Sequence, residues 1–247
     1  MSLGIIAALE EEGRTFSGCP IPSGEVVKLP DVGLMLVSGT GPDRARAAAR
    51  TLIENGASAL ISWGFACGLR SGIRSGDIVI PGLVIASDGG IHSTDSPWRE
   101  RLAARMSAHL SVCSGALVES RRVMPDSRSK ELLGRETGAL ASDMESASIC
   151  AAAFEAGIPY LAVRPVLDTL GMRVPECAGN CIDRQGRTRL LLLFSGLLRK
   201  PADLPDLIRL GWSFREARKS LKSAASVMLT IQPGHEHMTY PNQIRFY

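Results

Sequence analysis

The sequence predicts an α/β fold: a three-layer αβα sandwich in which helices cover both faces of a central mixed, mainly parallel sheet. Short runs rich in Ile, Val and Leu alternate with helical stretches along the first 168 residues. With 247 residues, 45% of them hydrophobic, the chain can bury one large core. No internal repeat or low-complexity linker divides it. We therefore expect one domain over residues 1–230 and an irregular tail over residues 231–247.

Seven apolar runs have the length and composition of buried strands. They are LGIIAAL (3–9), GLMLVSG (33–39), SALISWG (58–64), DIVIPG (77–82), GALVES (115–120), GALAS (138–142) and IPYLAVRPVLD (158–168).

Helices are predicted between these strands and after them. Residues 42–56 begin with Pro at the first turn and stop at Gly, the usual asymmetry of a helix. Further helices are expected over 96–110, 129–134, 187–198 and 203–224. The Gly-rich stretch 169–186 between strand and helix predicts a lid or pocket wall, or an ordinary loop.

Charge and hydropathy exclude several classes of protein. The formal charge of +3 is too small to indicate a nucleic-acid partner, and the basic character is concentrated in residues 183–222. The longest apolar run, Leu190–Leu198, is about half as long as a bilayer requires. Six scattered cysteines lack the dense spacing of a secreted disulfide scaffold. We expect a soluble cytoplasmic protein.

Two short motifs could suggest a metal, and neither has the pattern of a metal site. Cys177 and Cys181 have no second Cys or His pair nearby, and His235 and His237 lie in an aperiodic tail. We expect no metal and no organic cofactor.

Polar residues follow the predicted strands where each strand ends. Glu10, Glu11 and Glu12 follow 3–9, a Gly-Thr-Gly turn follows 33–39, and a second glycine turn follows 58–64. Asp168 ends 158–168. Ligands of α/β sheets bind at such carboxyl ends, so we expect one site there.

The turn Gly39-Thr40-Gly41 is not a dinucleotide-binding motif. Arg44 occupies the third glycine position, and the acidic residue expected about 20 residues later is missing. A glycine turn that opens a helix still presents N–H groups to an anion or a hydroxyl group. Thr40, Gly41 and Arg44 are therefore candidate ligands of an anion.

The segment SDMESA (142–147) places Asp143 and Glu145 before an uncharged helical stretch. Ser142 and Glu145 have the spacing of a capping box, and Asp143 suits the positive end of a helix dipole. A second interpretation is that Glu145 faces a ligand pocket, and both can hold at once.

The order of these motifs resembles the superfamily of purine nucleoside phosphorylases and methylthioadenosine/adenosylhomocysteine nucleosidases. The resemblance covers residues 3–168, and its motifs are GIIAALEEE (4–12), SGTG (38–41), WGFACGL (63–69), SDMES (142–146) and VRPVLD (163–168). The C-terminal region SGLLRKPADLPDLIRL also looks like the hopanoid-biosynthesis-associated phosphorylase branch.

The resemblance implies roles for particular residues. Glu145 would bind the two ribose hydroxyls, since a carboxylate accepts charge-assisted hydrogen bonds and favours an oxocarbenium-like sugar. Met144 would pack against the ribose, and Asp168 would donate a proton or hydrogen bond to purine N7. For this, Asp168 would have to be protonated. Glu12 matches the residue that activates water in the hydrolytic members, whereas we expect Glu10 and Glu11 to form a solvated turn.

The remaining substrate-binding residues that the resemblance implies are Gly64, Phe65, Asp143 and Val123. The phosphate-binding arginine and serine of bacterial phosphorylases are replaced by Ser62 and Phe65. A phosphorylase would need other donors, such as Thr40 and Gly41 with Arg44 or Arg14.

The segment 204–224 predicts a basic amphipathic helix, which suggests contact with an anionic membrane surface or packing on the core or a subunit partner. The family also implies a homo-oligomer.

Taken together, the motifs predict an enzyme that cleaves the N-glycosidic bond of an adenine-type nucleoside. The first hypothesis is a phosphorylase with inorganic phosphate as co-substrate, linked to hopanoid lipid synthesis. A hydrolytic nucleosidase that uses Glu12 is the second, and a nucleoside-binding protein without turnover is the third.

Overall fold

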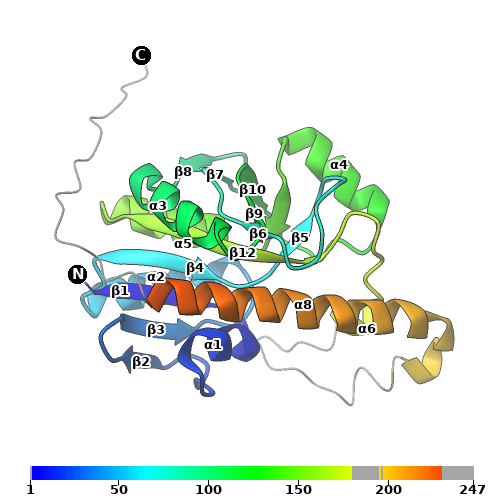
Figure 1. Cartoon of the computed structure of the whole chain (residues 1–247), viewed down its shortest axis with the longest axis horizontal. Helices are drawn as coiled ribbons and strands as arrows, with labels where there is room; N and C mark the ends of the chain where they lie inside the picture. The colour runs from blue at the N-terminus through cyan, green and yellow to red at the C-terminus, as the bar shows by residue number, and fades with distance from the viewer. Residues whose placement is uncertain (1, 180–194, 196, 230–247) are drawn as a thin grey trace.

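A computed structural model describes residues 2–179, 195 and 197–229 of the chain. Helices cover both faces of a large sheet (Figure 1). The strands are β1 (Leu3–Ala7), β2 (Val26–Leu29), β3 (Gly33–Val37), β4 (Ala59–Trp63), β5 (Ala66–Gly68), β6 (Ile78–Val79), β7 (Leu83–Ile85), β8 (Ile91–Ser93), β9 (Val112–Cys113), β10 (Ala116–Glu119), β11 (Ala141–Asp143) and β12 (Tyr160–Asp168). The helices are α1 (Glu10–Ser17), α2 (Pro42–Glu54), α3 (Ser96–Ser107), α4 (Ser127–Thr137), α5 (Ser146–Glu155), α6 (Glu176–Gly179), the 3₁₀ turn Pro201–Asp203 and α8 (Leu204–Leu229).

The sheet is mixed and mainly parallel, as the sequence predicts. Its order is β2-β3-β1-β4-β12-β5-β11-β10-β7-β8, and β6 and β9 branch from β12. Neighbouring strands are parallel except in the pairs β2–β3, β5–β11, β6–β12 and β7–β8. The three-layer αβα prediction is confirmed.

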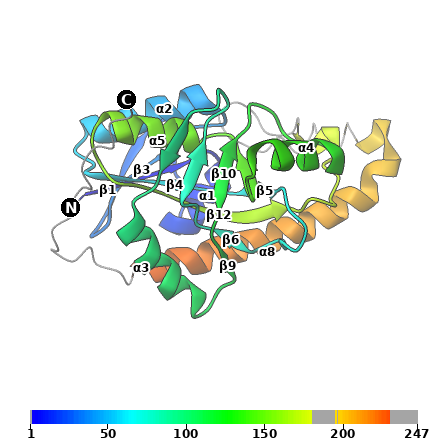
Figure 2. The same ribbon diagram turned by 90° about the horizontal axis from the view of Figure 1, so that it is seen from above.

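Alternating side chains of each central strand belong to two separate hydrophobic cores, because successive side chains of a strand point to opposite faces of the sheet. In β1, Ile6 joins the core beneath α2 and α5, whereas Ile5 joins the core beneath α1, α3 and α8. Figure 2 shows these two groups of helices on opposite sides of the sheet. Both layers thus arise from one period-two pattern.

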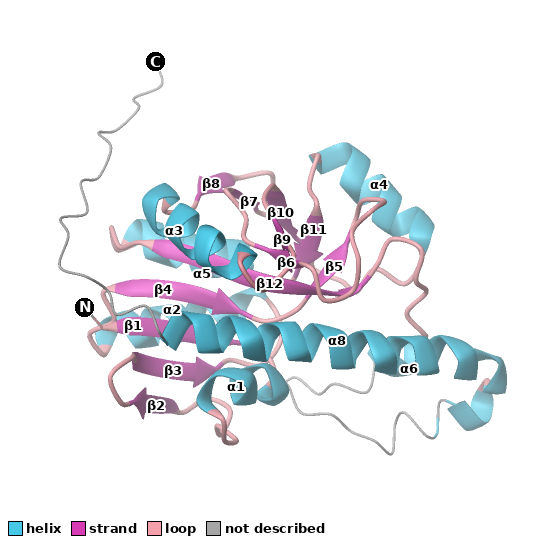
Figure 3. Ribbon diagram, viewed as in Figure 1, coloured by secondary structure: helices cyan, strands magenta, loops and turns pink. Residues whose placement is uncertain are grey.

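The long helix α8 crosses one face of the sheet (Figure 3). Its buried side chains are Ser213, Ala217, Leu221, Ala224, Ala225 and Met228, and most of them belong to the core beneath α1, α3 and α8. The prediction that this helix packs on the core is confirmed for that stretch. Within the residues that the structure describes, no helix is long and apolar enough to cross a bilayer.

Several sequence predictions needed correction. Glu10 and Glu11 do not form a solvated turn, because they begin α1, where acidic side chains favour the positive end of the helix dipole. Five short strands, β2, β5, β7, β8 and β9, were not predicted, since two to four residues carry too little periodicity. The predicted helix 187–198 lies largely outside the described residues, and so does the tail 231–247. The domain boundary at residue 230 therefore stays a prediction.

Candidate active site

The site forms where β12 passes from one neighbouring strand to another. The first half of β12 pairs with β4, up to Val163 beside Trp63, and the second half pairs with β5. Between these strands the chain turns at Gly64 and Phe65, and Arg164 lies level with this turn. The carboxyl ends of β1, β3 and β4 lie at this same edge, because all three strands are parallel in register.

Strand β11 approaches the same edge from the other direction. It pairs with β5 in the antiparallel sense, so its carboxyl end points back towards Arg164. The expectation that parallel strands would bring all the polar ends together is therefore correct for Glu12, Gly41 and Gly64. Asp143 and Glu145 reach the edge through an antiparallel strand.

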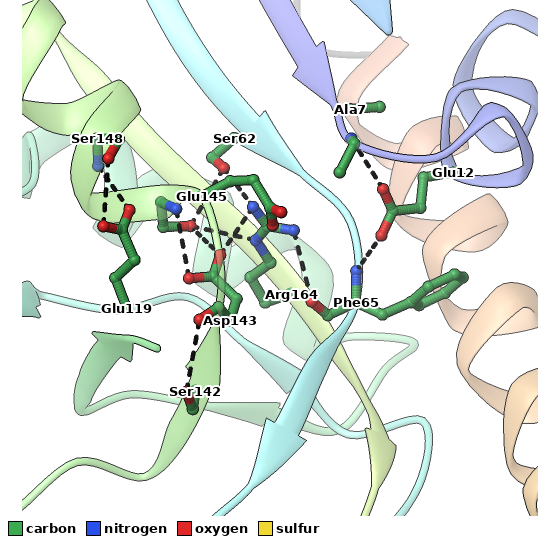
Figure 4. Close-up of polar contacts among 12 residues, drawn as sticks. Ala7, Glu12, Ser62, Phe65, Glu119, Ser142, Asp143, Glu145, Ser148 and Arg164 are labelled. Carbon is green, nitrogen blue, oxygen red and sulfur yellow. Dashed lines mark hydrogen bonds and ion pairs between the residues drawn. The ribbon is translucent and has the colours of Figure 1, made fainter. Parts of the chain in front are cut away.

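Arg164 is the centre of the cluster and is 1% exposed. Its Nη2 lies 2.8 Å from Oδ2 of Asp143 and also donates to the hydroxyl of Ser62. Its Nε donates to the hydroxyl of Ser146 over 3.2 Å, and Nη1 donates to the carbonyl oxygen of Phe65 over 3.4 Å. Figure 4 shows Arg164 between Asp143 and the Phe65 turn. All three nitrogens of the guanidinium group are thus used within the protein.

The start of α5 is capped differently from the capping box that the sequence predicts. Glu145 occupies the N-cap position, but its side chain makes no capping hydrogen bond. Instead Glu119 accepts from the backbone N–H of Ser148 over 2.8 Å, and Asp143 accepts from the N–H and the hydroxyl of Ser146. The capping-box prediction is wrong, since other carboxylates satisfy this helix end and release Glu145.

Glu145 contacts the glycine turn after β3. Its Oε1 accepts from the backbone N–H of Gly41 over 2.9 Å, and the residue is 6% exposed. Burial and then the charge of Asp143 raise the pKa of Glu145 to about 8, although Arg164 and the Gly41 N–H oppose the shift. The predicted sugar-binding carboxylate is therefore buried beside the predicted anion-binding turn.

Glu12 fastens the start of α1 to the Phe65 turn. Its Oε2 accepts from the N–H groups of Ala8 (3.0 Å) and Leu9 (2.8 Å), and its Oε1 accepts from the N–H of Phe65 (2.8 Å). Burial raises the pKa of Glu12 despite the opposing effects of Arg164 and these amides. A raised pKa brings a carboxylate towards the range in which it can act as a general base.

Gly64 is required by the close packing of this turn. A Cβ atom there would lie 2.4 Å from Nη1 of Arg164 and 2.5 Å from Oε1 of Glu12. A side chain at this position would push the two charged groups apart.

Asp168 forms a second buried group at the end of β12. It lies four residues beyond Arg164, about 13 Å along a strand. Its Oδ2 lies 2.7 Å from Nζ of Lys130, whose side chain is fully buried. Cys67 of β5 is next to it, and burial followed by the Asp168 charge raises the pKa of that thiol. The predicted acidic residues thus lie in two groups, one around Arg164 and one at the carboxyl end of β12.

Other predicted ligands lie around the cluster. Phe65 is buried, with its ring 5.4 Å from that of Phe214 in α8, whereas Met144 is half-buried between Asp143 and Glu145. Near the glycine turn, Thr40 is half-buried and Arg44 is exposed.

Two further candidates are not joined to the cluster by a contact among the described residues. Val123 is 48% exposed in the loop before α4, and Arg14 pairs with Glu11 over 3.3 Å. A hollow of about 430 Å³ lies beyond Asp168 and is lined by Thr169, Leu170, Gly171 and residues of α4 and the β5–β6 loop. In the described part of the chain no group of His, Cys, Asp and Glu side chains could hold a metal ion.

Sequence reasoning missed Arg164 and Lys130. An arginine inside the otherwise apolar run YLAVRPVLD is an available signal, because a charged residue in a buried strand requires a partner. Lys130 gives no such signal, since it lies in a polar helical segment.

The fold, with a buried acidic cluster at the edge of its sheet, defines a class of α/β protein. The model of the phosphorylase superfamily matches residues 24–180, and the chain belongs to this superfamily. The resemblance noted from the sequence motifs is confirmed at this level.

Solved structures of similar fold cover almost the whole chain. The methylthioadenosine/adenosylhomocysteine nucleosidase of Campylobacter jejuni is 16% identical, with a TM-score of 0.68 over 93% of this chain and 97% of that one. A Helicobacter pylori nucleosidase mutant with 5′-methylthioadenosine in its active site has a TM-score of 0.67, 16% identity, and coverage of 93% and 96%. Futalosine hydrolase of H. pylori has a TM-score of 0.63, 16% identity, and coverage of 92% and 97%. No curated protein matches the chain.

Proposed function

We propose that this protein is an enzyme that cleaves the N-glycosidic bond of an adenine-type nucleoside, with water as the attacking group. The observation that carries the proposal is the buried cluster in which Glu12 accepts from the Phe65 turn, Glu145 accepts from the Gly41 turn, and both interact with the charge of Arg164. Solved proteins of similar fold include nucleosidases and a hydrolase, which supports the same chemistry.

Charge favours water over phosphate in this cluster. Three carboxylates, those of Glu12, Asp143 and Glu145, surround one guanidinium group whose nitrogens are already used. A phosphate dianion placed there would meet three acidic groups, at least one of them ionised, and in the described part of the chain the cluster holds no cation besides Arg164, which is unfavourable in a site of low dielectric. The first hypothesis from the sequence, phosphorolysis, therefore becomes the second candidate.

One observation still favours phosphorolysis. Arg44 is exposed in the first turn of α2, where helix N–H groups and a cation can bind an anion together. Phosphate held by Arg44 and Thr40 would have to approach the sugar from the side of Gly41.

In the proposed mechanism each carboxylate has a separate task. Glu145, once ionised, accepts hydrogen bonds from the ribose hydroxyls and stabilises positive charge that develops on the sugar. Glu12 removes a proton from the attacking water, whose oxygen bonds to C1′ as the C1′–N9 bond breaks, and the departing purine anion takes up one proton, so that free adenine and the sugar are the products. Asp168, further along β12, contacts the base, so that the nucleoside lies along the strand between the two regions.

The test is release of free adenine from adenosine and from methylthioadenosine, with and without phosphate, followed by chromatography. Hydrolysis predicts ribose products and a rate independent of phosphate, whereas a phosphate requirement and a sugar 1-phosphate would establish phosphorolysis. Binding without base release on prolonged incubation would show that the protein binds nucleosides without turnover.

Glu12→Gln should lower kcat by about 10²-fold or more while it keeps the shape of the side chain. Glu10→Gln is the matched control, because it removes a charge from the same first turn of α1 and should leave kcat unchanged. Equal rates for the two variants would remove Glu12 from the mechanism.

Helix α8 supports two further proposals, on the 5′ substituent of the substrate and on the surroundings of the enzyme. The Phe65–Phe214 contact joins the site to this helix, on which Leu204, Ile208 and Trp212 are 46%, 53% and 62% exposed. These three side chains have the spacing of one helix face. We propose that the substrate carries a large apolar 5′ group, as the resemblance to the hopanoid-associated branch implies.

The same exposed face, with nearby arginines and lysines, would place the enzyme on an anionic membrane surface. Co-sedimentation with anionic but not neutral vesicles, lost in Trp212→Ser, is the expected result. A homo-oligomer is also proposed and is checked by light scattering. Absence of binding to either kind of vesicle would contradict the membrane proposal.

A further inference from the structure

Helix α1 carries Glu12 and is too short to hold its position by itself. It has eight residues, whereas isolated helices shorter than about 12 to 15 residues are marginal in water. Its ion pair with α8, from Arg218 to Glu11 at 3.4 Å, joins side chains that are 46% and 39% exposed, and such surface pairs contribute little. The position of α1 therefore depends on buried contacts.

A buried chain of hydrogen bonds joins α1 to the end of β4. The indole N–H of Trp63 donates to the hydroxyl of Thr15 over 2.9 Å, and that hydroxyl donates to the backbone carbonyl oxygen of Glu12 over 2.6 Å. Trp63 is fully buried, and the ring of Phe16 lies edge-on to it with the ring centroids 5.1 Å apart. A buried indole N–H needs a partner, and here the partner belongs to the helix that carries Glu12.

The same end of β4 also holds the carboxylate of Glu12. The N–H of Phe65, just beyond β4, donates to Oε1. The N–H groups of Ala8 and Leu9, just beyond β1, donate to Oε2. A carboxylate has about four acceptor positions, and backbone N–H groups occupy three of them here. The orientation of the carboxylate therefore depends on how α1 lies against these two strands.

The bond from Trp63 distinguishes Thr15 from other threonines in helices. A threonine hydroxyl often donates to the carbonyl oxygen three or four residues earlier, so the bond within α1 is ordinary by itself. Thr137 of α4 makes such a bond to Leu133 over 2.6 Å, but among the described residues no side chain donates to its hydroxyl. Only the hydroxyl of Thr15, of these two, connects its helix to a buried strand.

We propose that Trp63 and Thr15 are positioning residues that hold Glu12 in the place from which it takes a proton from the attacking water. The inference rests on the proposed function, in which Glu12 is the general base. Neither residue has to touch the substrate, because both act through the backbone of α1.

Thr15→Val removes the hydroxyl and keeps the shape of the side chain. We expect kcat for release of adenine to fall about tenfold or more with KM within about twofold, since a shift of a catalytic group by about 1 Å can cost about 100-fold. Thr15→Ser keeps the hydroxyl and should restore most of the rate. Thr137→Val is the matched control, because it removes a similar intrahelical bond, and should leave kcat unchanged.

Trp63→Phe removes the donor at the other end of the same bond and keeps an aromatic ring in the core. It should lower kcat in the same way, and it tests the proposal if Thr15→Val does not fold. In a Glu12→Gln background both substitutions should leave kcat unchanged within about twofold. Normal rates in both variants, or an equal fall in kcat with and without Glu12, would overturn the proposal.

The pH dependence of the rate is a readout that a loss of packing alone would not move. The three backbone N–H groups favour the ionised form of Glu12 and so oppose the burial that raises its pKa. A helix that shifts away from β4 weakens these bonds, so the pKa of Glu12 should rise further in Thr15→Val. A general base must be ionised, and the acidic limb of the profile of kcat against pH should therefore move to higher pH.

Failure of the proposed function gives a different result. If the wild-type protein releases no base, the pKa of Glu12 is followed by NMR titration of its carboxyl carbon in the same variants. A rise in Thr15→Val and Trp63→Phe that Thr15→Ser and Thr137→Val lack supports the positioning of the carboxylate without turnover. An unchanged pKa of Glu12 in both variants overturns it.

Discussion

The two buried charged groups on β12 differ in their charge balance. Around Arg164, one cation faces the carboxylates of Glu12, Asp143 and Glu145. Around Asp168, one carboxylate faces one ammonium group. Only the first group has an excess of acid, and there the pKa values of Glu12 and Glu145 rise. The excess of acid around Arg164 thus accompanies raised pKa values of two buried carboxyl groups.

The largest expected effect comes from removing the single cation of the first group. Arg164→Met removes the cation that faces the three buried acidic groups and leaves them only their neutral hydrogen-bond donors, so we expect it to lower the free energy of unfolding by about 3 to 5 kcal/mol. Urea denaturation measures this change.

Arg50→Met is the control, because Arg50 is 57% exposed and its pair with Glu155 at 3.3 Å is on the surface. Its expected cost is under about 1 kcal/mol. If the two substitutions cost the same, the cluster does not depend on Arg164 for its charge compensation.

The second effect depends on pH. The pKa of Glu145 is about 8 in the folded protein and 4.5 in the reference state, so folding favours the protonated form. The stability that this provides is complete below about pH 4.5 and is lost as the pH rises through about 8. A glutamine cannot ionise, so the stability of Glu145→Gln does not fall in this way. When the pH is raised from 5 to 9, the free energy of unfolding of the variant should therefore rise on the order of 2 kcal/mol relative to that of the wild type.

Chemical denaturation at the two pH values measures the difference. Glu54→Gln, at an exposed position in α2, should change stability by less than about 0.5 kcal/mol at both. A Glu145→Gln difference that does not vary with pH would mean that this carboxylate is not the proton-exchanging member of the cluster.

A third, smaller effect tests the packing of the cluster. Gly64→Ala places a methyl group against Arg164 and Glu12, and we expect a cost of about 1 to 3 kcal/mol with a lower rate of base release. Gly211→Ala, in α8 with open space around it, should instead stabilise the protein by about 0.5 to 1 kcal/mol. The melting temperature should fall in Gly64→Ala and rise in Gly211→Ala. A shift in the same direction for both variants would contradict this account.

The sequence predicted the central strands well, because their apolar runs are long enough to be told apart from the turns that bound them. It also led to Glu12, Glu145 and Asp168 through motif order. It could not predict how Glu145 is released from its helix, since the carboxylate of Glu119 that caps α5 in its place comes from a strand 29 residues earlier.

The burial of Lys130 is a feature that the sequence pattern does not predict. In SKELLG the pattern favours burial of the leucines, yet Lys130 faces inward and Leu132 faces solvent. Only the approach of Asp168 and the carbonyl oxygens of Thr169 and Met172 makes that orientation favourable. These partners are about 40 residues away along the chain.

The sequence by itself determined the α/β architecture, the strands at whose ends the acids lie, and membership of the superfamily through its motifs. These three features depend on local periodicity and on the order of residues, and both can be read from the sequence alone. Tertiary structure alone decided which charges meet: three acids at Arg164 and one at Lys130. The energy of a buried charge depends on neighbours from distant segments, and the chain brings those neighbours together only when it folds.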